Sequence, residues 1–297
     1  MTPTAHSSDS MKGVLAMMVA TLLLTLNDAV TKLLTEDYSF WQVLALRQLV
    51  SLGVVVLYIH WYTGWDAMKI TNRTGVALRA VFFVATTVFI VASFSMLPLA
   101  FVTAIAFSSP VFVVAFSHFF TSESVGPRRW LAVLVGFVGV LTIVRPGGAD
   151  FSYVLVLPVL AALTAGIRDV ITRGLSRTES SISILFWSNV AVITLALIVT
   201  TMIGWQAITP VAALLLLLNG LLNASAHFLI IDALRLGDAS LVSPFRYSGL
   251  LWAIMLGLVI WGDFPDAWTL LGATLLIASG IYIIERAPRA AKQGTDQ

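Results

Sequence analysis

Two charged residues lie inside the first long apolar stretch of the chain. Asp28 and Lys32 are four residues apart, so an α-helix would place their carboxylate and ammonium groups on one face. Thr21 and Thr25 extend that face towards the N-terminus. A charge in an apolar environment is costly unless it meets a partner or water, so this stripe predicts a functional site. In a structural alternative, Asp28 and Lys32 pair with each other, or Lys32 extends to the membrane surface.

The same charged pattern recurs 141 positions later. The correspondence joins Asp28 to Asp169, Thr31 to Thr172, and Lys32 to Arg173, with Arg168 directly before the second aspartate. Charged helices at matching places in two halves are typical of transporters built from repeats. Chance similarity between two apolar helices is the alternative. The pattern adds Arg168 and Asp169 to the candidate site residues.

A second polar stripe consists of Asn219, Asn223 and His227. Their spacing of four residues places them in one column on a helix. Amides and an imidazole both donate and accept hydrogen bonds, so the column could hold an amino or a carboxylate group. The alternative is hydrogen bonding between neighbouring helices.

Arg246, Tyr247 and Trp252 follow Pro244 in the ninth apolar segment. Pro244 should free the carbonyl of Ser240 and break the helix there. Arg246 is expected either to bind a carboxylate or to pair with Asp169. Tyr247 and Trp252 offer aromatic surface, with core packing as the alternative. The predicted substrate-binding residues are therefore Asp28, Lys32, Arg168, Asp169, Asn219, Asn223, His227, Arg246, Tyr247 and Trp252. Arg47 adds further positive charge, and the excess favours an anionic group such as a carboxylate.

The composition requires a membrane environment for these residues. The chain is 59% hydrophobic and only 11% charged, with a mean hydropathy of +0.94, whereas soluble domains carry about 25% charged residues. Ten continuously apolar segments are long enough for transmembrane helices rather than β-strands; they span residues 13–34, 40–62, 75–97, 99–120, 130–145, 152–173, 181–203, 210–231, 239–261 and 268–285. The chain has no cysteine, so disulfides and thiolate metal ligands are excluded.

The positive charges between these segments predict the orientation. One side receives Lys12, Lys69, Arg73, Arg128, Arg129, Arg173, Arg177, Arg235, Arg286, Arg289 and Lys292, whereas the other receives only Arg145 with several acidic residues. Because basic residues gather in cytoplasmic connections, both termini are expected to be cytoplasmic. The expected location is an inner membrane of bacterial type.

The chain divides into two halves, residues 1–149 and 150–297, with five spans each. Trp65 and Trp205 correspond at an offset of 140, and Gly139 and Gly280 correspond at an offset of 141. An odd number of spans per half inverts the second half in the membrane. Inverted repeats place a binding site near the midplane between them.

Several short motifs give this organisation a family resemblance. The first half contains Leu97-Pro98-Leu99-Ala100, then Pro110, Glu123, Trp130 and Gly139-Val140, and the second half repeats the pattern from Ala233 to Gly280. The chain resembles the drug/metabolite transporter superfamily in its EamA-type branch, and within it looks most like the aromatic amino-acid exporters of the YddG type. Asp263 stands where the family pattern has glutamate. The resemblance implies an all-α integral membrane fold in which helices 1–4 and 6–9 surround a central cavity and helices 5 and 10 are peripheral.

These observations favour a secondary transporter working by alternating access. The resemblance implies export of amino acids, with broad specificity that favours aromatic or large apolar ones. The alternatives are efflux of drugs or quaternary amines, another metabolite carrier, a channel, or an intramembrane enzyme. The sequence contains no H-E-x-x-H or G-x-S-x-G motif, so an enzyme is not expected. The expected partners are a small-molecule substrate and the lipid bilayer; no metal, cofactor or nucleic acid is expected, and the oligomeric state is left open.

Overall fold

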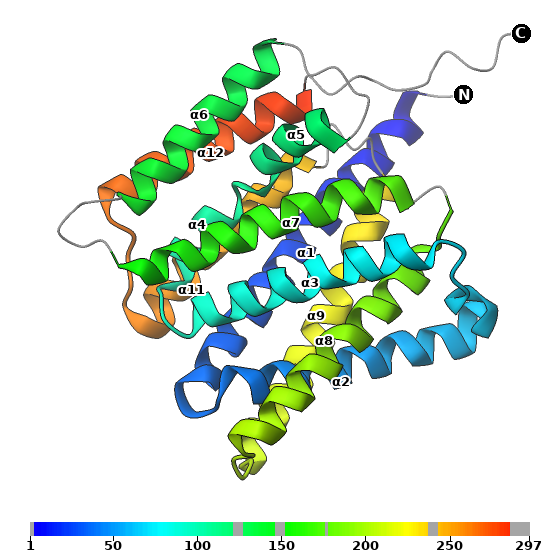
Figure 1. The fold of residues 1–297 in the computed structure, drawn as a ribbon. Coiled ribbons are helices and arrows are strands. Elements are labelled where there is room, and N and C mark those ends of the chain that lie inside the picture. Colours follow the sequence, from blue (N-terminus) through cyan, green and yellow to red (C-terminus); the bar gives the residue numbers. More distant parts are fainter. Residues whose placement is uncertain (1–2, 121–126, 146–151, 176–177, 237–242, 286–297) are drawn as a thin grey trace, which may run out of the picture.

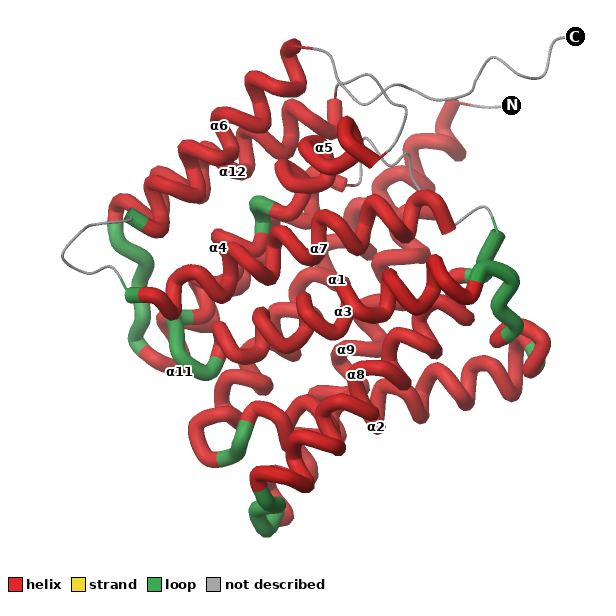
Figure 2. Tube along the Cα trace, in the orientation of Figure 1, coloured by secondary structure: helices red, strands yellow, loops and turns green. Residues whose placement is uncertain are grey.

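The computed structural model describes residues 3–120, 127–145, 152–175, 178–236 and 243–285. These residues form helices and short connections, without a strand (Figures 1 and 2). The α-helices are α1 (Pro3–Asp37), α2 (Phe40–Tyr58), α3 (Arg73–Phe94), α4 (Leu99–Ala106), α5 (Ser109–Phe120), α6 (Pro127–Val144), α7 (Val156–Leu175), α8 (Ser181–Ile203), α9 (Pro210–Leu236), α11 (Ser248–Trp261) and α12 (Ala267–Glu285). A π-helical turn, Ile59–Thr63, extends α2, and 3₁₀ turns cover Trp65–Met68, Tyr153–Leu155 and Ser243–Tyr247.

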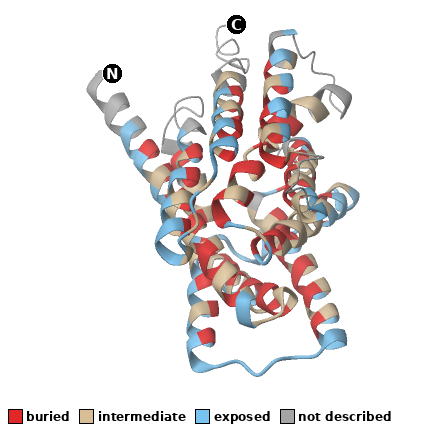
Figure 3. Cartoon of the chain, turned by 90° about the vertical axis from the view of Figure 1, so that its left-hand side faces the viewer, coloured by how far each residue is buried: buried red, intermediate tan, exposed pale blue. Residues whose placement is uncertain are grey.

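The predicted apolar spans are present as helices. Within the described residues, seven helical segments are long and apolar enough to cross a membrane, and three shorter apolar helices cover Trp130–Val144, Phe245–Trp261 and Ala267–Tyr282. Many large apolar side chains are exposed on the outer faces of the bundle, such as Leu134 on α6 and Val259 on α11. Figure 3 shows the buried residues turned towards the interior. This distribution suits lipid, where an exposed apolar side chain carries no penalty.

The fourth predicted span is not one continuous helix. It divides into α4 and α5 at Phe107 and Ser108. Pro110 has no backbone N–H, and its ring would clash with the carbonyl of Ala106 in a continuous helix. The break is closed by a tighter turn, in which the backbone N–H of Ser108 donates to the carbonyl of Ile105 at 2.9 Å. The ninth span also begins irregularly, with the 3₁₀ turn that contains Pro244; Ser240, whose carbonyl was predicted to be freed, lies outside the described residues.

The helix packing is symmetric between the repeats. Helix α1 packs on α9, and its counterpart α7 packs on α3. The contacts of α2 with α9 and of α1 with α11 are matched by those of α8 with α3 and of α7 with α5. Two pairings map onto themselves, namely α2 with α8 and α6 with α12. This pattern is that of a two-repeat membrane fold. The boundary at residues 149 and 150 lies outside the described residues and stays a prediction.

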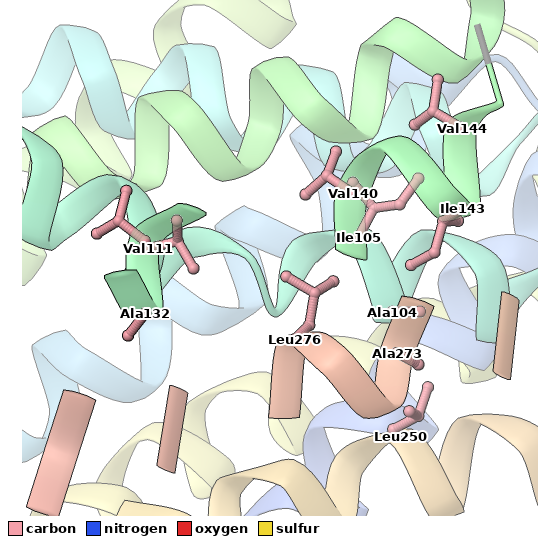
Figure 4. Packing of buried hydrophobic residues seen from close by; sticks show 11 residues of the cluster. Ala104, Ile105, Val111, Ala132, Val140, Ile143, Val144, Leu250, Ala273 and Leu276 are labelled. Atoms are coloured by element: carbon pink, nitrogen blue, oxygen red, sulfur yellow. The ribbon is translucent and has the colours of Figure 1, made fainter. Parts of the chain in front are cut away.

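Helices α6 and α12 form a pair at the edge of the bundle. They pack on each other and on α4 and α5, and Figure 4 shows Val140 and Ile143 of α6 near Ala273 and Leu276 of α12. The two backbones approach closely, because a Cβ on Gly139 would lie 2.9 Å from the carbonyl oxygen of Gly272. The fifth and tenth spans are therefore peripheral, as the resemblance implied.

Candidate functional site

A cavity of about 180 Å³ lies between the two repeats. Six helices line it, α1, α2 and α3 from the first repeat and α7, α8 and α9 from the second. The lining residues are Leu24, Asn27, Asp28, Arg47, Gln48, Ser51, Val55, Phe83, Thr86, Thr87, Ile90, Arg168, Leu185, Asn189, Asn223, Ala224, His227 and Phe228. The fourth and ninth spans were also expected to line the cavity, but no residue of α4, α5 or α11 is in this lining. Helix α11 packs on the far side of α1, against α4, and so does not reach the cavity.

Four of the predicted site residues meet at this cavity. Asp28 comes from α1, Arg168 from α7, and Asn223 and His227 from α9. The cavity wall thus combines a carboxylate, a guanidinium, an amide and an imidazole. The structure brings them together because α1 crosses α9 and α7 crosses α3 around the same interior space.

Asp169 acts on the cavity through Arg168. The Arg168 guanidinium donates from Nε and Nη2 to Asp169 Oδ1 at 2.9 and 2.7 Å. It also lies 5.9 Å from the ring centroid of Phe83. The predicted pair of Asp169 with Arg246 is therefore replaced by a pair with the neighbouring residue. Asp169 itself is not among the lining residues, but Arg168 is, and the contact with Asp169 orients the Arg168 guanidinium.

Lys32 and Asn219 bond to the protein instead of lining the cavity. The Lys32 ammonium donates to the carbonyl of Leu97 at 2.8 Å and lies 5.2 Å from the ring centroid of Trp261. The Asn219 amide donates to the carbonyl of Asn27 at 2.8 Å and to Thr31 Oγ1 at 3.0 Å. The first contact ties α1 to the turn after α3, and the second ties α9 to α1.

The three candidates from the ninth span lie apart from the cavity lining. Tyr247 is buried and packs edge-on against Phe107, with 5.2 Å between the ring centroids. Trp252 is half-buried, whereas Arg246 is exposed. Tyr247 thus packs against a neighbouring ring, as in the core-packing alternative. All three depended on a ninth span that faced the cavity, and that span faces α1 and α4 instead.

The cavity also contains residues that were not among the predicted site residues. Arg47 was recognised only as buried charge, and Gln48, Asn189, Phe83 and Phe228 were not recognised. Gln48 Nε2 donates to Asn189 Oδ1 at 2.6 Å, and the two positions are 141 apart. This separation equals the offset between Asp28 and Asp169, so the repeat alone could have identified the pair. The bond therefore joins equivalent positions and lies where the two repeats meet.

Two equivalent threonines each bind an arginine, but from different helices. Arg47 of α2 donates from Nη1 to Thr31 Oγ1 at 3.0 Å. Arg79 of α3 donates from Nε to Thr172 Oγ1 at 3.0 Å and from Nη1 to Ser188 Oγ. Ser188 occupies the position equivalent to Arg47 at the offset of 141. Each of the two equivalent threonines is thus bound by one guanidinium.

Within the part of the chain that the structure describes, no group of three or more His, Asp or Glu residues gathers that could hold a metal ion.

Comparisons with known proteins agree with this architecture. The EamA-like transporter family model matches twice, over residues 11–145 and 152–285. The S-adenosylmethionine uptake transporter of Rickettsia bellii is 28% identical over 89% of this chain and 90% of its own length. The riboflavin transporter of Rhizobium johnstonii is 28% identical, covering 96% and 95%, and the pseudopaline exporter CntI of Pseudomonas aeruginosa is 26% identical, covering 91% and 95%. One crystal structure matches with a TM-score of 0.61 at 17% identity, covering 93% of this chain and 96% of that one.

These relatives are named for several different substrates and do not single out the aromatic amino-acid exporters. The crystal structure supports the fold alone, because its sequence identity is low. The double match of the family model covers most of the chain and coincides with the two groups of helices that surround the cavity. The chain therefore belongs to the EamA-like transporter family of the drug/metabolite transporter superfamily, and it is a secondary transporter of small metabolites, not an enzyme.

Proposed function

We propose that this transporter carries amino acids and related metabolites that bear an α-amino-acid group, with a preference for aromatic or large apolar substrates. The observation that carries the proposal is the composition of the cavity wall. It combines the Asp28 carboxylate with the guanidinium groups of Arg47 and Arg168, and it adds the rings of Phe83 and Phe228.

Both signs of charge suit a zwitterion. The ammonium of an amino acid requires an acceptor such as Asp28, and its carboxylate requires a donor such as Arg47 or Arg168. Asn223 and His227 add neutral hydrogen-bonding groups, which suit binding that must be released on the other side of the membrane. Phe83 and Phe228 provide apolar surface for a side chain without enclosing it in a charged pocket.

The relatives support an aromatic, amino-acid-bearing substrate without restricting it to one compound. S-Adenosylmethionine, named for the Rickettsia relatives, carries an α-amino-acid group and an aromatic base. Riboflavin, named for the Rhizobium relative, is aromatic but has no such group. A flavin is therefore the second candidate, and it would depend on the two phenyl rings more than on Asp28. A lipophilic cation is the third, and it would depend on Asp28 and the rings without the arginines.

The proposed mechanism is alternating access by two inverted repeats around the fixed cavity. We place the protein in an inner membrane of bacterial type with both termini cytoplasmic, on the distribution of the basic residues. The proposed net direction is export. Relatives named for uptake and for export both occur, so the direction should be measured in the same experiment.

Transport should be tested with purified protein in proteoliposomes. The probes are labelled phenylalanine, S-adenosylmethionine, riboflavin and a quaternary amine, each offered in counterflow with and without a proton gradient. Phenylalanine or S-adenosylmethionine should exchange faster than in empty vesicles, and Arg168→Gln should slow that exchange. Movement of the quaternary amine or riboflavin alone, with no amino acid moved, would overturn the proposal in favour of the corresponding alternative.

A further inference from the structure

We infer that Arg47, Asn27 and Gln48 form a subsite that holds the α-carboxylate and the α-ammonium of the substrate. The inference rests on the proposed function and goes beyond it, because it assigns the head group of the substrate to named side chains of the cavity. All three residues line the cavity, Asn27 from α1 and the other two from α2.

Each of these side chains is almost fully buried yet has a free polar atom. Arg47 is 6% exposed, and Asn27 and Gln48 are each 2% exposed. Arg47 Nε, Asn27 Oδ1 and Gln48 Oε1 have no hydrogen-bond partner among the residues that the structure describes. A buried polar atom without a partner is destabilising, so such atoms need an explanation. Here one donor and two acceptors of this kind belong to side chains that line the same cavity, which is the arrangement expected for a ligand that supplies both complements.

Each of these side chains also makes a hydrogen bond through another atom. Arg47 Nη1 donates to Thr31 Oγ1 at 3.0 Å, and Asn27 Nδ2 donates to Asp28 Oδ1 at 3.5 Å. Gln48 Nε2 donates to Asn189 Oδ1 at 2.6 Å, so Oε1 is the atom of its amide left over. These bonds orient the side chains before a ligand arrives, and preorganisation of this kind favours selective binding.

The arginine that binds the equivalent threonine, Thr172, is different. Arg79 uses its Nε for Thr172 at 3.0 Å, and its Nη1 donates to Ser188 and to the carbonyl of Ile184. Arg79 is not among the residues that line the cavity. Of the two threonine-bound arginines, Arg79 serves packing, and only Arg47 keeps a donor free at the cavity. The head-group subsite is therefore built from the first repeat alone, from α1 and α2.

The charges of the subsite match both halves of a zwitterion. A carboxylate on the substrate would accept from Arg47 Nε, whose charge strengthens the hydrogen bond. An ammonium has three donors, and Asn27 Oδ1, Gln48 Oε1 and the Asp28 carboxylate supply three acceptor groups. Asp28 also lines the cavity, and within the described residues no ion pair joins it to Arg47. Its carboxylate therefore stays available for the substrate.

Substrate analogues separate the two halves of this recognition. Binding to purified protein would be compared for phenylalanine, for phenethylamine, which lacks the carboxylate, and for 3-phenylpropionate, which lacks the ammonium. Arg47→Gln should weaken the binding of phenylalanine and 3-phenylpropionate by about 10- to 100-fold, the range for hydrogen bonds to charged groups. The binding of phenethylamine should stay within about twofold of wild type. Asn27→Ala should weaken phenylalanine and phenethylamine by about 5- to 20-fold and spare 3-phenylpropionate.

Arg79→Gln is the matched control, since it removes the guanidinium that binds the equivalent threonine and lies outside the cavity lining. It should change the affinity for all three ligands by the same factor or leave all three affinities unchanged. Should Arg47→Gln fail to fold, Arg47→Lys retains the charge and should still weaken phenylalanine selectively against phenethylamine, because lysine lacks the Nε donor at that position. If a folded Arg47 variant binds all three ligands more weakly by the same factor, the subsite is overturned, but the proposed function is not. If wild-type protein binds and moves no amino-acid-bearing probe, the proposed function itself fails.

Discussion

At the scale of single residues, the repeat relates two aspartates that the packing treats differently. Asp28 lines the cavity, and its carboxylate accepts a hydrogen bond from Asn27 Nδ2 at 3.5 Å. Asp169 is 44% exposed and bound by Arg168. We expect Asp28→Asn to lower the initial rate of amino-acid exchange by about tenfold or more, because a charged acceptor of the ammonium is lost. Asp169→Asn should have a smaller effect, since it only loosens Arg168.

The measurement is initial-rate counterflow in proteoliposomes, normalised to the amount of reconstituted protein. His60→Ala is the control, because His60 is exposed in the π-helical turn after α2. It should exchange substrate at the wild-type rate. Full activity of a well-expressed Asp28→Asn variant would remove Asp28 from the site.

The sequence does not show how each helix is rotated about its axis, and this limited which residues could be assigned to the cavity. Residue type and spacing identified Asp28, Arg168, Asn223 and His227, all of which line the cavity. Spacing also placed Thr21 and Thr25 on the face of Asp28. In the structure both turn towards the ninth span, since Thr21 hydrogen-bonds Ser248 at 2.8 Å and Thr25 donates to the carbonyl of Gly249 at 3.4 Å. One helix has several neighbours, and spacing alone does not say which part of a polar stripe meets each of them.

At the scale of the elements, a close contact between α2 and α9 holds two walls of the cavity together. A Cβ on Gly220 of α9 would lie 2.5 Å from Val50 Cβ and 2.8 Å from the carbonyl oxygen of Arg47. The second atom belongs to the backbone and cannot move aside. Gly220→Ala should therefore force the helices apart and destabilise the fold by about 1–3 kcal/mol.

Thermal unfolding in detergent would measure this effect. The matched control is Gly53→Ala on α2, where an added Cβ meets nothing within 4 Å. Alanine is a better helix former than glycine, so the control should be as stable as wild type or slightly more stable. Equal midpoints for the two variants would show that the helices do not approach as closely as described.

An ion pair outside the spans joins the residue after α6 to the residue before α12. Arg145 Nη2 lies 2.6 Å from Asp266 Oδ2, and the side chains are 38% and 43% exposed. Partial burial raises the pKa of Asp266, but hydrogen bonds from Thr269 and the charge of Arg145 outweigh it and hold the pKa below its ordinary value. A lowered pKa gives stability that is present at neutral pH and is lost as the pH falls through the folded-state pKa.

We expect this contribution to be small, about 0.2–1 kcal/mol, because the pair is exposed to solvent. The drop in unfolding temperature from pH 7 to pH 3 should be smaller in Asp266→Asn than in wild type, since the variant has already lost the carboxylate. An unchanged or larger drop in the variant would mean that the pair does not contribute in this direction.

Continuous apolar runs predicted the membrane helices well, because length and hydropathy decide whether a segment can cross a bilayer. The break between α4 and α5 was missed, although Pro110 was visible in the sequence. Apolar composition remains uniform across such a break, so hydropathy does not reveal it. The position of the ninth span was missed for another reason, since its packing behind α1 depends on contacts between distant segments.

At the scale of the whole molecule, we expect the chain to cross the membrane an even number of times. Figure 1 shows α1 beginning and α12 ending towards the same side of the bundle. The connection after α2, with Thr63, should face that side, and the connection after α8, with Ala207, should face the other. Both residues are exposed, and the chain has no cysteine that would interfere with labelling.

Single cysteines at these two positions test the orientation. In intact cells, an impermeant thiol reagent should label Ala207→Cys directly and Thr63→Cys only after the membrane is made permeable. Labelling of both variants from outside would contradict this topology, because an even number of spans precedes Thr63 and an odd number precedes Ala207. Labelling in the reverse order would instead place both termini outside the cytoplasm.

The bond between Gln48 and Asn189 has a consequence for the energy balance between the two access states. If the repeats exchange their conformations during transport, a contact between equivalent positions is converted into itself. Such a contact contributes equally to both states and cannot shift their populations. The contacts of Arg47 with Thr31 and of Arg79 with Thr172 have no such symmetry, because the two arginines come from non-equivalent positions. Both contacts are present in the conformation that the structure shows. Weakening either of them should therefore shift the resting population of this carrier in the same direction, away from this conformation and towards the other access state.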